Sequence, residues 1–171
     1  MNKILFILFL GIFTTGKSQE NWISQENGKL DYSIPDNWNV SEFKKVNNNK
    51  IYGATFFDVG KTSVFSVLEM PNDTGIPNAE ELTNEDAKNL TLNFFSPSST
   101  FITVENQKIS EINVKYVKAK ATTSQGLKLT ANTYYVFYDG SFIKIDGIYT
   151  SEYESEFLPI IKKIINSIKI N

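Results

Sequence analysis

Apolar and polar residues alternate along much of the chain with the period of two that is typical of β-strands. The first such stretch runs from Leu30 to Ile34 and stops at Pro35, and a second begins at Trp38. Six longer stretches with the same alternation lie at residues 51–57, 62–70, 101–109, 112–122, 127–138 and 142–149. The pattern therefore predicts about seven or eight strands.

Two segments change to the period of an α-helix. The first begins after Asn78 or Thr83, either of which can cap it, and Thr83 has capping-box spacing to Asp86. The second begins at Ser151, which has the same spacing to Glu154. The apolar faces are formed by Ala87, Leu90 and Phe94 in the first helix and by Tyr153, Phe157, Ile161, Ile164 and Ile168 in the second. The order of strands, helix, longer strands and helix predicts one α+β domain. We expect an antiparallel β-sheet in two meander halves, split by the first helix and packed with both helices.

One turn between the later strands has a strong local signal. Asp139-Gly140 lies between two alternating aromatic stretches, which is typical of a type I′ hairpin turn. Such a turn aligns Tyr135 with Lys144 and Thr133 with Asp146. We therefore expect these four side chains to share one face of the sheet.

A two-residue turn at Gln125-Gly126 would extend this face, because it would place Tyr116 beside Tyr135 and Lys118 beside Thr133. The candidate ligand- or partner-binding patch is then formed by Tyr116, Lys118, Lys120, Thr133, Tyr135, Lys144 and Asp146. The opposite face is small and apolar, and we expect it to be the core beneath the last helix: Val117, Ala119, Ala121, Val136, Ile143, Ile145 and Gly147. The alternative for the polar patch is an ordinary solvated sheet face. A change of one residue in the turn would move one strand's side chains to the other face and divide the patch.

The N-terminus has the layout of a secretory signal peptide. Lys3 gives it a positive start, Ile4–Phe13 is an apolar run, and Ser18 is a small residue at the expected cleavage point. We expect removal of residues 1–18, which leaves one domain at residues 19–171 in the periplasm or outside the cell. The alternative is an uncleaved anchor, but the run is short for a hydrocarbon core of about 30 Å. The chain has no cysteine, so we expect no lipid anchor of the lipoprotein type.

Composition narrows the functional classes. The 171 residues include neither histidine nor cysteine, which removes the commonest general base and the commonest transition-metal ligands. The acidic residues cluster at predicted helix N-termini, where the helix dipole favours them, so we expect no metal and no cofactor. Loss of Lys3 and Lys17 with the signal leaves 15 lysines against 19 acidic residues, a net charge of −4. With that charge and no arginine, nucleic acid is not an expected partner. No later apolar segment approaches the length of a membrane span.

Two local motifs resemble those of the PsbP-like superfamily. One is the segment from Tyr32 to Trp38, which reads Tyr-Ser-Ile-Pro-Asp-Asn-Trp, and the other is the closing helix with Phe157, Ile164 and the ending Ser167-Ile168. The resemblance implies an α/β/α sandwich built on an antiparallel sheet. It also implies an accessory or assembly protein without a catalytic constellation, and it transfers no particular ligand.

These observations favour a non-catalytic, exported binding or assembly-accessory protein whose partner is a protein of the cell envelope. The alternative is a small-ligand carrier or a small hydrolase that uses lysine, tyrosine and aspartate on the sheet face. A deep pocket in which these side chains converge would favour the alternative, and a shallow surface would favour partner binding.

Overall fold

The computed structural model describes residues 21–46 and 48–171, so the predicted signal segment at residues 1–18 lies outside the described residues. The first half contains β1 (Trp22–Asn27), β2 (Leu30–Pro35), β3 (Asn39–Val46), β4 (Asn49–Asp58), β5 (Lys61–Pro71) and α1 (Asn84–Phe94). The second half contains β6 (Thr100–Ile109), β7 (Ile112–Thr122), β8 (Lys128–Tyr138), β9 (Ser141–Thr150), a 3-10 turn (Ser151–Tyr153), α2 (Glu154–Ser167) and β10 (Lys169–Ile170). The prediction of an α+β fold is confirmed, and β1 and β10 are additional strands.

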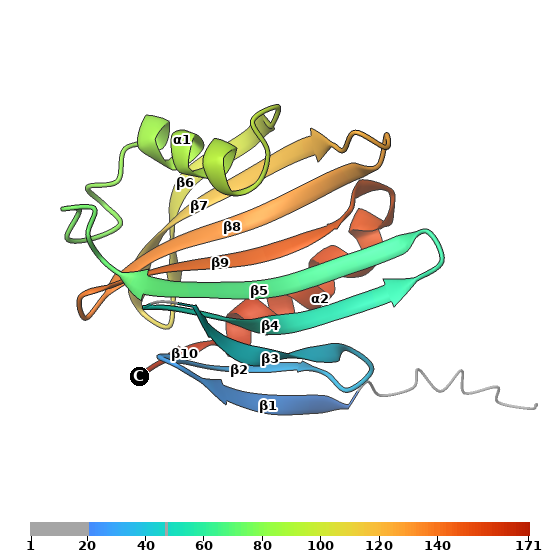
Figure 1. Ribbon diagram of the computed structural model, residues 1–171, viewed down its shortest axis with the longest axis horizontal. Helices are drawn as coiled ribbons and strands as arrows, with labels where there is room; N and C mark the ends of the chain where they lie inside the picture. Colours follow the sequence, from blue (N-terminus) through green and yellow to red (C-terminus); the bar gives the residue numbers. More distant parts are fainter. Residues whose placement is uncertain (1–20, 47) are drawn as a thin grey trace, which may run out of the picture.

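Seven strands form one antiparallel sheet in the order β3-β4-β5-β9-β8-β7-β6, and β1-β2-β10 form a smaller antiparallel sheet. The two meanders, β3–β5 and β6–β9, are joined where β5 pairs with β9 and Ser63 lies opposite Tyr149. In Figure 1, α1 lies across one face of the large sheet and α2 lies behind it. The result is an α/β/α sandwich, with the small sheet packed beside α2.

Helix α2 is held by apolar packing between the two sheets. Phe157, Ile161 and Ile164 are buried, as predicted, and they share a core cluster with Leu30 and Tyr32 of β2. The burial of one face of a helix against apolar strands is the main source of stability for a helix of this length. The small sheet therefore packs on a second side of α2, while Lys162, Lys163 and Asn166 stay exposed.

Gly147 of β9 lets α2 approach the large sheet closely. A Cβ atom added to Gly147 would lie 2.3 Å from Cγ2 of Ile161, well inside van der Waals contact. A glycine is required here because the helix occupies the volume that any side chain would need.

The connection between β7 and β8 differs from its prediction. The strands are joined by a five-residue loop at residues 123–127, where Thr123 N–H donates to the Leu127 carbonyl at 2.9 Å. Gly126 lies within this loop with a φ of +81°, and it does not form a two-residue turn with Gln125. As a result, the strands pair one residue away from the predicted register.

This shift turns β7 over relative to β8, because successive strand residues point to opposite faces. Val117 lies opposite Thr133, whereas the prediction placed Lys118 there. Val117 packs in a cluster beneath α1, while Ile143 and Ile145 of β9 pack in the core that contains α2. The predicted single core face beneath the last helix is therefore correct for β9 and wrong for β7.

The other local predictions have mixed outcomes. Asp139 and Gly140 both have positive φ, 46° and 67°, and the predicted register across this hairpin is confirmed. Thr83 caps α1 by accepting a hydrogen bond from the Asp86 N–H at 3.1 Å, as predicted. The capping box at Ser151 is wrong, because Ser151 begins the 3-10 turn and α2 has no side-chain cap.

A buried polar cluster lies between α1 and the sheet. Lys144 and Asp146 are 5% and 6% exposed and form an ion pair, and Thr133 donates a hydrogen bond to Asp146 at 2.7 Å. The hydroxyls of Tyr135 and Thr91 of α1 are 2.9 Å apart and hydrogen-bonded. Because each buried polar group has a partner in this cluster, the desolvation of the two charges is compensated.

We predict that Gly147→Ala destabilises the protein by about 1–3 kcal/mol, because the new methyl group collides with Ile161. Urea unfolding measures the loss. Adding Ile161→Leu removes the Cγ2 methyl and should recover part of it. Equal stability of wild type and Gly147→Ala would show that α2 does not lie this close to β9.

We predict that Asp146→Ala costs about 3–5 kcal/mol, because it leaves Lys144 buried without a counter-charge. The double variant Lys144→Met with Asp146→Leu should unfold at higher denaturant than Asp146→Ala, since it buries no charge. Lys108→Ala, at an exposed ion pair with Glu111, is the control and should change little. The burial of the ion pair would be contradicted if Asp146→Ala behaved like this control.

Candidate functional site

The predicted binding patch is divided between the two faces of the large sheet. Four of its residues lie beneath α1 in the buried polar cluster: Thr133, Tyr135, Lys144 and Asp146. The other three lie on the opposite face: Tyr116, Lys118 and Lys120. The prediction of a single exposed patch is therefore wrong. The five-residue loop before β8 divides the patch, because it shifts the strand register by one residue.

The burial of Tyr135, Lys144 and Asp146 argues against the alternative of a hydrolase or carrier that acts through these side chains. Tyr135 is fully buried, and Lys144 and Asp146 bind each other beneath α1. A substrate could reach these groups only if α1 moved away, so their arrangement is that of a structural cluster.

On the opposite face, β7 is tied to the start of α2. Lys118 Nζ lies 2.6 Å from Glu154 Oε1, and Lys120 Nζ lies 3.8 Å from the other carboxylate oxygen. The hydrogen bond from Lys118 is the largest influence on Glu154 and lowers the pKa of its carboxyl group. Lys118 therefore positions the start of α2. Lys120 is more exposed, and its side chain also lines a pocket at the end of the sheet.

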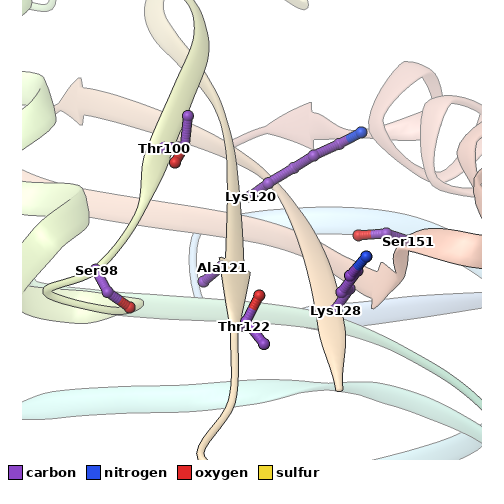
Figure 2. Close-up of a pocket in the computed structure, with 7 residues that line it drawn as sticks. All are labelled: Ser98, Thr100, Lys120, Ala121, Thr122, Lys128 and Ser151. Carbon is purple, nitrogen blue, oxygen red and sulfur yellow. The ribbon is translucent and has the colours of Figure 1, made fainter. Parts of the chain in front are cut away.

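Lys120 lines a pocket of about 340 Å³ beside the end of β7. Figure 2 shows its lining side chains, which come from the segment before β6, from β6, β7 and β8, and from the turn after β9. They are Ser98, Thr100, Lys120, Ala121, Thr122, Lys128 and Ser151. Four hydroxyls and two lysine amines thus offer hydrogen-bond donors, acceptors and positive charge to a polar group.

Two further pockets continue this one across the end of the sheet. A pocket of about 530 Å³ shares Lys128 and Ser151 with the first, and a pocket of about 170 Å³ shares Leu127 and Thr150 with the second. We call the three together the end groove. The hydroxyl-rich part of the groove is the pocket that Lys120 lines. The apolar part is the pocket lined by both Phe57 of β4 and Leu127.

Exposed apolar side chains stand beside the apolar part of the end groove. Phe57 is 78% exposed and Val59 is 91% exposed, at the turn between β4 and β5, and nearby Leu127 is 40% exposed. We call residues 57–60 the β4–β5 tip. Large apolar side chains gathered at one point of a surface, next to a groove, are typical of an interaction site.

The hydroxyl of Ser151 shows what kind of chemistry the end groove offers. It hydrogen-bonds to the Thr130 hydroxyl at 2.7 Å, and a threonine hydroxyl is not a general base that could activate a nucleophile. The groove therefore has the means to bind a ligand through hydrogen bonds, charge and apolar contact.

Sequence reasoning found Lys120 and missed the rest of the end groove. The groove is built from segments near residues 58, 98, 127 and 151, which are distant in the sequence and meet only through strand pairing. One signal was readable: Phe57 and Val59 flank Asp58 at a predicted hairpin connection, where polar residues are usual.

Two features are absent from the part of the chain that the structure describes. Neither helix within residues 21–46 and 48–171 has the length and apolar character to cross a bilayer. Over the same residues, no group of three or more acidic side chains is placed to hold a metal ion.

Comparison with known proteins gives no match to a protein-family model and no match among curated sequences. Solved structures do match. The PsbP protein of the cyanobacterium Synechocystis sp. PCC 6803, CyanoP, aligns with a TM-score of 0.62 at 10% identity, over 91% of this chain and 96% of that one. LpqN of Mycobacterium tuberculosis, which is involved in cell envelope biogenesis, aligns with a TM-score of 0.60 at 13% identity, over 90% and 91%.

A third similar structure is PA94 of Pseudomonas aeruginosa, a protein of unknown function. It aligns with a TM-score of 0.57 at 11% identity, over 88% of this chain and 97% of that one. All three likenesses extend over nearly the whole described domain, and at these identities they bear on the fold alone. The chain has a PsbP-like fold.

Proposed function

We propose that the protein is an exported, non-catalytic binding module of the cell envelope and that its protein partner docks on the β4–β5 tip and the end groove. The observation that carries the proposal is the exposure of Phe57 and Val59 at that tip. Apolar surface in water costs about 25 cal/mol per Å², so a partner that covers these side chains gains affinity.

The chemistry around the tip supports a protein partner. Phe57 and Leu127 supply an apolar anchor, and an aromatic side chain loses little rotamer entropy when it is buried in an interface. Lys120 and Lys128 lie in the other part of the same groove, where they suit acidic or hydroxyl-bearing groups of a partner. An apolar centre beside a polar rim is the usual anatomy of a protein interface.

The proposed location rests on the N-terminal pattern and on the neighbours by fold. Residues 1–18 have the composition of a signal peptide, and LpqN, one of the similar structures, acts in cell envelope biogenesis. The absence of histidine and cysteine from the sequence also favours binding over catalysis.

The tip proposal predicts a site-specific crosslink. A photo-crosslinking phenylalanine analogue at Val59, in the protein expressed in its native host, should give a discrete adduct with one envelope protein. The same analogue at Ile23 of β1, which is 43% exposed, is the matched control and should give none. Changing Phe57 to Ser should weaken the Val59 adduct. Equal adducts from both positions, or none from Val59, would contradict the proposal.

Export predicts a shortened protein. Intact-mass analysis of material recovered from the periplasm or the medium should show loss of about 18 residues, because cleavage follows the small residue Ser18. Recovery there of a chain that still carries Met1 would contradict cleavage.

A further inference from the structure

A separate cleft of about 380 Å³ lies between the outer part of the large sheet and α2. It is lined by Glu105, Gln107, Lys108, Tyr116, Tyr134, Lys162, Ile165 and Asn166. None of these residues lines the end groove, which lies toward the other end of β7. The cleft is therefore a second candidate site, independent of the proposed partner surface.

The cleft has an aromatic floor in a fixed position. Glu105, Tyr116 and Tyr134 follow one another across β6, β7 and β8 in a single cross-strand row. The two rings have centroids 4.9 Å apart and planes tilted by 36°, and the Tyr116 hydroxyl donates to Asn132 at 2.7 Å. Ile165 of α2 completes the apolar part of the lining. Tyr134 is only 7% exposed and lies mostly in the core, so the half-buried ring of Tyr116 is the larger aromatic surface open to a ligand. Strand pairing and the hydrogen bond to Asn132 hold this ring, so that surface is preformed.

The walls carry amides and one carboxylate. Gln107 Nε2 donates to Glu105 Oε1 at 2.7 Å, so the Gln107 carbonyl oxygen and the second Glu105 oxygen are left to accept hydrogen bonds from a ligand. Asn166 stands on the opposite wall, on exposed helix surface. Burial is the main influence that raises the pKa of Tyr134 to about 12. Its hydroxyl, neutral at physiological pH as in any tyrosine, can donate a hydrogen bond.

The charge around the cleft is nearly balanced. Lys108 and Lys162 line it together with Glu105, and Lys108 also lies 4.0 Å from Glu111. A phosphate would need an excess of positive charge, and a purely apolar ligand would cover the wall amides without satisfying them. The lining instead suits a ligand with an apolar face and several hydroxyl groups.

We propose that this cleft binds a short neutral saccharide. The C–H faces of a sugar ring pack on an aromatic floor, and its hydroxyls both donate and accept hydrogen bonds, as the amide, carboxylate and phenol groups of this lining require. A concave site with an apolar base and a few converging polar groups is the usual form of a small-ligand site.

The test is calorimetric titration of the whole secreted domain with neutral tetrasaccharides: maltotetraose, cellotetraose and N-acetylated chitotetraose. Trigalacturonate and a tetrapeptide are run beside them to report an acidic sugar or a peptide strand. We expect millimolar or tighter binding of at least one neutral tetrasaccharide. Binding of none of them, or tighter binding of trigalacturonate or the peptide, would overturn the proposal.

Variants then locate the binding. Asn166→Ala, on exposed helix surface, should weaken binding severalfold, and Tyr116→Ala should weaken it about tenfold or more by removing most of the accessible aromatic surface of the floor. Tyr116→Phe keeps the ring and should bind within about twofold of wild type, which separates loss of the floor from loss of the Asn132 hydrogen bond. Lys163→Ala, next to Lys162 but outside the lining, is the matched control. Binding that Asn166→Ala and Tyr116→Ala leave unchanged would overturn the assignment to this cleft, while Phe57→Ser should have no effect on it.

Discussion

The register between β7 and β8 decides which side chains of the outer sheet meet which helix. Strand residues alternate between faces, so the five-residue loop at 123–127 places the side chains of β7 on the opposite faces from those that a two-residue turn would give. With the observed loop, Lys118 reaches Glu154 at the start of α2, and Tyr116 forms the floor of the cleft beside that helix. With the other register, both side chains would lie under α1. The ion pair at the start of α2 and both candidate sites thus depend on this one connection.

The two helices contact the large sheet through different combinations of apolar and polar interactions. Helix α2 lies in an apolar core that includes both sheets, and Gly147 lets it come close to β9. Helix α1 packs on a smaller apolar cluster that includes Ala87 and Val117, and it also covers Lys144, Asp146 and Tyr135, whose polar groups must each keep a partner while buried. Apolar packing tolerates small changes of position, whereas a buried ion pair with its hydrogen bonds tolerates few. The hydrogen bond between Thr91 and Tyr135 therefore restricts where α1 can lie on the sheet, and the apolar clusters supply more of the stability.

Much of the fold was predictable from local pattern, and the errors have clear physical causes. Asp139-Gly140 predicted its hairpin register correctly, because both residues accept the positive φ that a two-residue type I′ turn requires. Gln125-Gly126 gave the wrong loop length, because one glycine with positive φ is compatible with several loops.

Tertiary context explains the other differences. Ser151 has capping-box spacing, but its hydroxyl bonds instead to Thr130, an interaction between elements that spacing cannot reveal. β1 has no buried side chain and β10 has two residues, so neither has an apolar alternation to detect. The end groove was beyond prediction for the same reason, since its residues meet only when distant strands pair.

The join between β5 and β9 has a consequence for how the chain folds. Within each meander, neighbouring strands are close in sequence, so the meanders can form early and separately. The β5–β9 pairing instead brings together residues separated by α1 and three strands, and its loop-closure entropy is correspondingly large. We expect this seam to close late, with the central edges of both half-sheets open until then. During that interval the chain is most exposed to strand-mediated aggregation, and a chaperone would protect it best by covering β5 or β9.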